Sequence, residues 1–138
     1  MDWKLELIVV PATDVDRSKS FYLDQVGFDL LVDHSAGEDF RVVQLVPSGS
    51  DCAIAVMKQP ERAGKVLGLH LIVTDIDAAR SELQERGVEV TELYHFGDGG
   101  QMPGPDPDRR DYNSFFGFED PDSNGWQVQE VKRNRTDV

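Results

Sequence analysis

The stretch Gly68–Gly87, GLHLIVTDIDAARSELQERG, decides the fold. Its first part, Leu69–Val73, is apolar apart from one histidine and predicts a strand. Thr74 then offers a hydroxyl for a helix N-cap, and Asp77 stands where the acid of a capping box would reach back. The apolar side chains that follow share one stripe of a helix, namely Ile76, Ala79 and Leu83. Gly87 ends that helix, an alternating strand resumes after it, and the stretch therefore predicts a βαβ unit.

The same pattern occurs once earlier in the chain, between Leu5 and Val32. Leu5–Val9 matches Leu69–Val73 in residue type, and Thr13–Asp16 matches Thr74–Asp77. In each copy a segment of helix length follows and ends at a glycine. Two copies are too few for a solenoid, so the repeat predicts a duplicated half-domain.

Composition restricts the classes of protein to which the chain can belong. Its 138 residues suit one domain, and no apolar run is long enough to span a membrane. The chain does not start with a charged stretch followed by an apolar segment, the pattern of a secretory signal peptide. The single cysteine, Cys52, has no internal disulfide partner. We therefore expect a cytoplasmic protein. The formal charge of −12 disfavours nucleic acid and anionic membranes as partners and attracts cationic solutes.

Strand and turn signals predict an α+β fold of two βαβββ modules. The expected single domain is divided into a first module at about 4–57, a linker at about 58–66, a second module at about 67–131 and a polar tail at 132–138. One long helix is expected at 14–26, a strand at 88–96, and an irregular loop rich in Gly, Pro and Asp at 97–111. A connection of that length in a compact domain is typical of a functional loop.

Several motifs resemble the vicinal oxygen chelate superfamily, which includes glyoxalase I, extradiol dioxygenases, and the fosfomycin and bleomycin resistance proteins. They are Thr13–Ser18, Phe21–Tyr22, Gly27–Phe28, Asp75–Ala79 and Asp120–Trp126. The resemblance implies that open mixed sheets curve around a cavity and that metal ligands lie on the inner faces of the strands. It also implies that modules pair across a homodimer. Fold alone does not determine activity in such families.

The resemblance places metal ligands at positions where this chain has poor donors. Counting from the motifs puts them at Leu7, Gly68 and Gln127, and the strand at 52–57 contains no His, Glu or Gln. Leucine and glycine side chains cannot bind a metal, and an amide is a weak donor for a divalent cation. We therefore expect no cofactor and no metal. The alternative is a divalent metal that His70 recruits through a shift of strand register.

The candidate site residues are of two kinds. His70 and His95 are candidate catalytic acid–base groups, although a histidine in such a strand is more often a hydrogen-bonded cavity residue. The candidate ligand-binding residues are Gln44, Tyr94, Arg109, Arg110, Tyr112, Gln127 and Gln129. We expect the loop from His95 to Tyr112 to close a pocket floored by His70 and the two last-strand glutamines. The opposing interpretation is a solvated loop and a polar edge strand.

Three functions remain open. The first is a metal-free protein of the bleomycin-resistance kind that binds a small polar or cationic molecule in a cavity lined by the sheet. The second is a metal-dependent lyase, isomerase or dioxygenase of the glyoxalase kind. The third is a metal-free enzyme that uses His70 or His95 as its acid–base group. Whether the protein is an enzyme is left open, and a homodimer is expected in each case.

Overall fold

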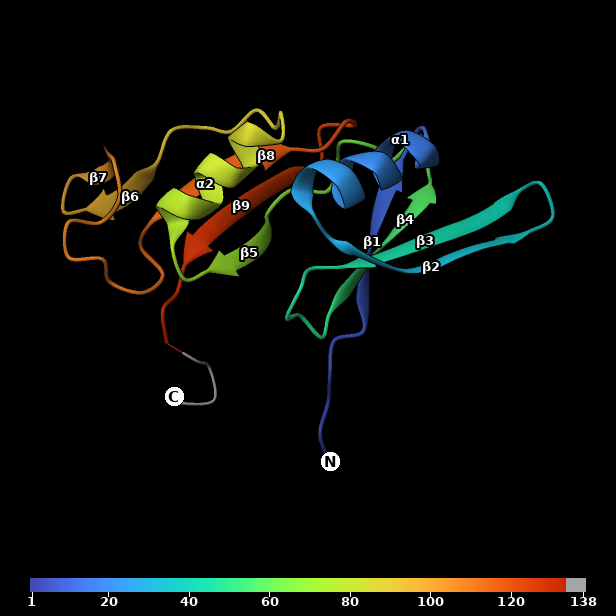
Figure 1. Ribbon diagram of the computed structural model, residues 1–138, viewed down its shortest axis with the longest axis horizontal. Coiled ribbons are helices and arrows are strands. Elements are labelled where there is room, and N and C mark those ends of the chain that lie inside the picture. The colour runs from blue at the N-terminus through green and yellow to red at the C-terminus, as the bar shows by residue number, and fades with distance from the viewer. Residues whose placement is uncertain (134–138) are drawn as a thin grey trace. The chain divides into compact units, whose positions relative to one another are not determined.

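The computed structural model describes residues 1–133 and contains two compact units, each with an open mixed sheet and a helical segment (Figure 1). One unit is Met1–Leu67 with Asp120–Asn124, and the other is residues 68–119 with residues 125–133. This confirms the α+β class and the two modules. No helix among residues 1–133 is long and apolar enough to cross a membrane.

The first unit contains a four-stranded sheet in the order β1-β4-β3-β2. Its elements are β1 (Leu7–Ala12), α1 (Val15–Ser20), η1 (Phe21–Val26), β2 (Asp29–Ala36), β3 (Phe40–Val46) and β4 (Ala53–Lys58). β1 runs parallel to β4, and the other pairs are antiparallel. Fully buried Val10, Val56 and Val43 form a row across β1, β4 and β3 and lie in the core.

The single helix expected at 14–26 is instead an α-helix followed by a wider π-helical turn. The N–H of Gly27 donates to the carbonyl of Tyr22 five residues back (3.0 Å), which is the π pattern. Gly27 then takes a φ of 90°, a conformation that glycine adopts without strain. Six residues are too few for the apolar spacing to distinguish this turn from an α-helix.

The N-cap expected at Thr74 is also one residue too early. Asp75 caps the second helix, because its carboxylate accepts from the N–H of Ala78 (3.0 Å). Asp14 does the same for the first helix, where it accepts from the N–H of Arg17 (3.2 Å). A carboxylate at this position also interacts favourably with the helix dipole.

The turn Asp120–Asn124 connects separate segments of the first unit by hydrogen bonds. Asn124 donates to the carbonyl of Pro11 (2.9 Å) and to Asp120, whose carboxylate accepts from the hydroxyl of Tyr22 (2.7 Å). The side-chain oxygen of Asn124 accepts from the N–H of Gly64 (3.0 Å). A Cβ added at Gly64 would lie 2.7 Å from the carbonyl oxygen of Asp122, so only glycine fits this close approach. The closing motif is therefore a structural clamp.

The second unit contains a five-stranded sheet in the order β5-β9-β8-β6-β7. Its elements are β5 (Leu69–Val73), α2 (Ile76–Glu85), β6 (Tyr94–Gly97), β7 (Gly100–Pro103), β8 (Phe115–Glu119) and β9 (Gly125–Glu130). β5 is parallel to β9, and β8 and β9 form the hairpin that Asn124-Gly125 indicates. Helix α2 lies along the strands β5 and β9 (Figure 1).

Two expectations for this unit are wrong. The strand expected at 88–96 begins only at Tyr94. Before it, the N–H of Val88 donates to the carbonyl of Leu83 in α2, and Thr91 bonds to Gly117 of β8 partly through its side-chain hydroxyl instead of a regular ladder. The loop expected at 97–111 contains the extra strand β7, which forms a hairpin with β6. Gly100 has a φ of 101° and permits this tight turn.

Candidate functional site

Strand β9 separates a buried face from an open face in the second sheet. Trp126, Val128 and Glu130 are buried, whereas Gln127 and Gln129 are half-buried and point the other way. The parallel partner β5 places His70 opposite Gln127 and Ile72 opposite Gln129. His70, Ile72 and the two glutamines therefore share the open face.

Three aromatic rings cover the neighbouring part of this open face. Tyr94 of β6 stacks on Phe115 of β8 with ring centroids 5.2 Å apart. Phe96 meets Phe115 edge-on at 5.6 Å and Tyr94 at 5.9 Å. Phe96 is 49% exposed, so the cluster presents apolar ring surface to solvent. We call Tyr94, Phe96 and Phe115 the aromatic cluster.

A hydrogen bond connects the aromatic cluster to β9. The hydroxyl of Tyr94 donates to the side-chain oxygen of Gln127 (2.7 Å). Burial raises the pKa of the Tyr94 phenol above its ordinary value, which keeps it a neutral donor. Because the oxygen of Gln127 accepts this proton, its NH₂ group is the end of the amide that remains to meet a ligand.

Gly117 of β8 makes room for that amide. A Cβ at this position would lie 2.8 Å from Nε2 of Gln127 and 3.1 Å from the carbonyl oxygen of Trp126. Any side chain there would displace the amide. The sequence analysis missed Gly117, although a glycine inside an apolar strand is a known signal of close approach.

The ring of His70 is held in one tautomer. Its Nδ1 lies 2.6 Å from the carbonyl oxygen of Gly68, and a carbonyl only accepts, so Nδ1 carries the proton. In the neutral ring, Nε2 is then an acceptor. The residue is exposed and lies directly opposite Gln127 in the strand register. An acceptor and a donor thus come from adjacent strands.

A cavity of about 440 Å³ adjoins the aromatic cluster. Its lining residues are Thr91, Glu92, Leu93, Tyr94, Gln101, Met102, Pro103 and Gln127. Of the predicted binding residues, Tyr94 and Gln127 line it. The sequence analysis missed Gln101 and Met102, because β7 was expected to be an irregular loop.

Comparison with known proteins identifies the family. The profile of the Glyoxalase/Bleomycin resistance protein/Dioxygenase superfamily matches residues 4–128. The chain belongs to this superfamily. Among curated proteins it is similar to the uncharacterized protein YetH of Bacillus subtilis (strain 168), with 22% identity over 126 residues, covering 89% of this chain and 94% of YetH.

Solved structures of the superfamily show the same fold. TnmS3, an antibiotic binding protein from Streptomyces sp. CB03234, is 31% identical with a TM-score of 0.74, covering 94% of this chain and 96% of its own. A glyoxalase/bleomycin resistance protein from the same organism is 32% identical with a TM-score of 0.71, covering 92% of this chain and 100% of its own.

The donor atoms at the superfamily's metal positions do not fit a metal ion. Leu7 and Gly68 have no side-chain donor, and the oxygen of Gln127 already accepts from Tyr94. Residues 1–133 contain no group of three or more His, Cys, Asp or Glu side chains arranged to hold a metal. His70 alone supplies too few ligands for a divalent cation. That the protein works without a metal stays a prediction.

His95 lies apart from the cavity. It is only 8% exposed and alternates with Tyr94 along β6, so it lies on the opposite face of the strand. Its Nδ1 is 2.8 Å from the carbonyl oxygen of Gly104, at the start of the loop that follows β7. His95 is therefore a buried residue whose ring holds the start of the loop after β7 through Gly104.

The two arginines of the loop are committed to ion pairs. Arg109 contacts Asp77 (2.6 Å) at the start of α2 and Glu130 (3.1 Å), which is buried on the helix-facing side of β9. Arg110 contacts Asp106 (2.7 Å). Arg109 is therefore on the other side of the sheet from Gln127, and the structure does not bring it to the cavity as a lid residue.

Tyr112 and Gln129 meet at the end of β9. The amide of Gln129 donates to the backbone carbonyl of Tyr112 (3.1 Å), and the N–H of Tyr112 donates to the carbonyl of Glu130 (2.9 Å). Gln129 thus holds the loop while it shares the open face with Gln127. Tyr112 contributes backbone to this contact, and its half-exposed ring is outside the cavity lining.

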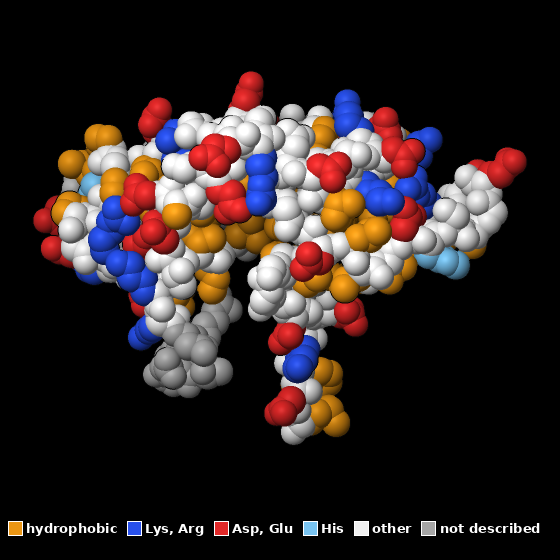
Figure 2. Space-filling model, viewed as in Figure 1, with side chains coloured by type: hydrophobic (Ala, Val, Ile, Leu, Met, Phe, Trp, Pro, Cys, Tyr) orange, Lys and Arg blue, Asp and Glu red, His pale blue; other side chains and the backbone are white. Residues whose placement is uncertain are grey.

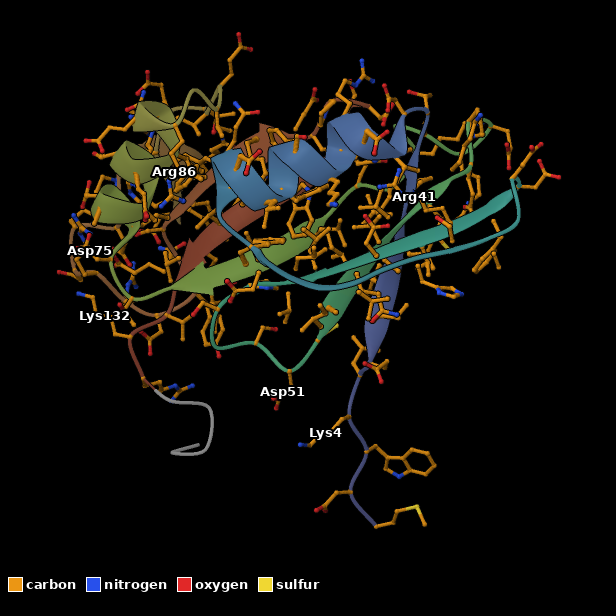
Figure 3. All side chains as sticks on the ribbon, turned by 45° about the vertical axis from the view of Figure 1, so that its right-hand side comes forward. Lys4, Arg41, Asp51, Asp75, Arg86 and Lys132 are labelled. Atoms are coloured by element: carbon orange, nitrogen blue, oxygen red, sulfur yellow. The ribbon has the colours of Figure 1, made fainter. Side chains whose placement is uncertain are left out.

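Gln44 belongs to the first unit. It lies on β3 opposite Ala55 of β4 and Val32 of β2. A separate cavity of about 450 Å³ in this unit includes Asp16 and Arg41 in its lining (Figure 3 labels Arg41). Arg41 is bonded to Asp33 (2.9 Å) and Asp16 (2.6 Å). Hydrogen bonds from Arg41 and then Lys19 hold the pKa of the Asp33 carboxyl well below its usual range. The Arg41 guanidinium is therefore already ion-paired with Asp16 and Asp33.

Proposed function

We propose that this superfamily member binds a small polar or cationic organic molecule on the open face of its second sheet, without a metal. The observation that carries the proposal is the Tyr94–Gln127 hydrogen bond over Gly117. It orients one amide donor beside the aromatic cluster, at the wall of a cavity. Apolar surface with a few fixed polar groups is typical of small-molecule sites.

The charge of the protein supports a cationic ligand within this class. The formal net charge is −12, and acidic side chains are spread over the face seen in Figure 2. Ring faces such as those of Phe96 and Tyr94 attract cations by about 0.5–1 kcal/mol at exposed sites. The acidic field raises the local concentration of cations by a further, salt-dependent amount. The similarity to TnmS3, an antibiotic binding protein, supports binding as the primary role.

A metal-free enzyme is the second candidate, and His70 is the observation that favours it. Its Nδ1 is anchored to Gly68, so Nε2 of the neutral ring is available to take a proton. We also propose that the protein is a homodimer and that it is located in the cytoplasm. The family resemblance supports the homodimer, and the composition supports the location.

The test is a thermal-shift screen with matched pairs of small aromatic compounds, one neutral and one cationic in each pair. We expect cationic members to raise the melting temperature of the wild type more than their neutral partners do. Gln127→Met, which removes the NH₂ donor without adding a charge, and Tyr94→Phe should both reduce the shift. Gln84→Met on the exposed surface of α2 is the matched control. Equal shifts in all four proteins would contradict the proposal.

A further inference from the structure

One acidic side chain, Glu92, lines the cavity beside the aromatic cluster. The other described residues of the lining are neutral, and none of them is a lysine or an arginine. A carboxylate that no cation of the lining balances attracts a positively charged group of a ligand and repels a negatively charged one. The cavity therefore has a charge preference of its own, separate from the net charge of the protein.

The backbone on both sides of Glu92 is fixed. On the preceding side, the N–H of Thr91 donates to the carbonyl of Gly117 (2.9 Å), and the N–H of Gly117 donates to the hydroxyl of Thr91 (2.8 Å). On the following side, the carbonyl of Leu93 accepts from the N–H of Gly104 (2.8 Å). These bonds hold the segment in place although it lies outside the strands, and a charged group that selects a ligand needs such support.

The carboxylate of Glu92 makes only a loose ion pair within the protein. The side chain is 95% exposed, and its Oε2 lies 3.7 Å from Nη2 of Arg80. The Nε of Arg80 donates to the carbonyl of Thr91 (2.8 Å), so the backbone holds that guanidinium whether or not Glu92 is present. An exposed ion pair contributes little to stability. Glu92 is therefore available to a ligand.

We propose that Glu92 determines the specificity of this cavity by selecting a molecule with a protonated amine. The inference rests on the proposed function, since it names the ligand class of the same site. The amine lies against the carboxylate at the rim, and the apolar body packs on Tyr94 and on the thioether of Met102. A hydrogen-bond acceptor of the ligand meets the NH₂ group of Gln127. The ligand class is therefore an aromatic amine that also carries a carbonyl group.

The test compares three probes that share a benzamide core, which supplies the ring and the carbonyl. The cationic probe is para-(aminomethyl)benzamide, the neutral one is para-methylbenzamide, and the anionic one is terephthalamic acid. Dissociation constants come from chemical-shift titrations. We expect the wild type to bind the cationic probe about two- to fivefold more tightly than the neutral one, which is the range of an exposed ion pair. The anionic probe should bind most weakly.

Replacing Glu92 by Gln removes the charge and keeps the shape of the side chain. The dissociation constant of the cationic probe should rise about two- to fivefold, to that of the neutral probe, whose own value should stay unchanged. Glu89→Gln is the matched control, because Glu89 is exposed in the same segment before β6 but does not line the cavity. It removes the same unit of charge from the protein, and we expect it to preserve the preference.

Several outcomes would overturn the role of Glu92. Equal binding of the cationic and neutral probes by the wild type does so, as does a preference that survives in Glu92→Gln. A preference lost equally in Glu89→Gln assigns it to the net charge of the protein instead. Melting temperatures check that each variant is folded.

Gln127→Met separates these failures from a failure of the proposed function. If Gln127→Met weakens all three probes while Glu92→Gln has no selective effect, the site stands and only the role of Glu92 falls. If the wild type binds none of the probes, or if Gln127→Met alters the binding of none, the proposed site falls together with this inference.

Discussion

At the scale of single residues, the site depends on how neighbouring side chains restrict one another. Gln127 stands at a position where metal-binding members of its superfamily would be expected to carry a ligand, but its oxygen accepts from Tyr94. The sequence analysis identified both residues, because strand parity and the closing motif located them. It missed Gly117, since only the crossing of two strands shows that the amide needs the space of an absent Cβ.

Replacing Gly117 by Ala tests this close approach. The new Cβ would lie 2.8 Å from Nε2 of Gln127 and 3.1 Å from the carbonyl oxygen of Trp126, so the amide bonded to Tyr94 must shift. We expect the free energy of unfolding to fall by about 1–3 kcal/mol, the typical cost of overpacking. Gly99→Ala, where a Cβ meets nothing within 4 Å, is the matched control in chemical denaturation. Equal stability of the two variants would show that the amide can yield without cost.

Replacing His70 by Ala separates binding from structure. The side chain is exposed, and it is bonded to the carbonyl of Gly68, two residues earlier in the chain. We therefore expect the melting temperature to stay within a few degrees, while the affinity for the best compound of the screen changes. A large loss of stability with unchanged binding would make His70 a structural residue.

At the scale of elements, the strands and helices that carry strong periodicity were predictable, and the short or bent ones were not. β5 matches the expected strand Leu69–Val73, because an apolar run followed by a helix-start signal defines it. The π-helical turn at Phe21–Val26 and the hairpin of β6 and β7 were missed, because six residues and four residues are too short for a period to stand out. Arg109 and Arg110 form ion pairs, as the opposing interpretation of a solvated loop allowed, and their role as ligand-binding residues stays a prediction.

The correction at the start of α2 has a direct test. Asp75→Ala removes the carboxylate that accepts from Ala78, and we expect a loss of about 0.5–2 kcal/mol in the free energy of unfolding. Thr74→Ala, at the position that the sequence analysis favoured, should cost much less. Urea denaturation of both variants decides between them, and a larger effect at Thr74 would reverse the assignment.

The loop after β7 should show a pH dependence that Asp106 controls. Its side chain is buried and accepts from Arg110, Asn113 and the N–H of Asp108, and the Arg110 guanidinium holds the pKa of its carboxyl well below the usual range. A depressed folded-state pKa adds stability above the unfolded-state pKa, and that stability is lost as the pH falls toward the folded-state value.

Asp106→Asn should accordingly lower the melting temperature at neutral pH. The difference from wild type should shrink steadily as the pH falls below about 4, the ordinary pKa of an aspartate. Asp108→Asn, whose side chain accepts from no described residue in the loop, is the control in the same series of scans. A difference that stays constant down to low pH would contradict the role of the carboxylate.

At the scale of the whole molecule, the α+β class and the two-module repeat were predictable because duplication leaves a visible signal in the sequence. The choice between binding protein and enzyme was not predictable, because the superfamily's scaffold motifs carry no catalytic residues.

The formal net charge of −12 is a property of the whole molecule that bears on ligand choice. If the electrostatic field of this negative charge assists binding, the affinity for a cationic compound should fall as the salt concentration is raised. The affinity for its neutral partner compound should change little. Parallel titrations at low and high salt check this, and equal salt dependence would argue against the field.

The most direct test of the ligand site is a heteronuclear NMR titration that follows the side-chain amides of the glutamines. The Gln127 signal is assigned from its loss in Gln127→Glu, and those of Gln44 and Gln101 are assigned in the same way. On addition of the best compound from the screen, the account predicts the largest shift at Gln127 and a smaller one at Gln101, which lines the same cavity. Shifts confined to Gln44 in the first unit, with Gln127 unmoved, would contradict it.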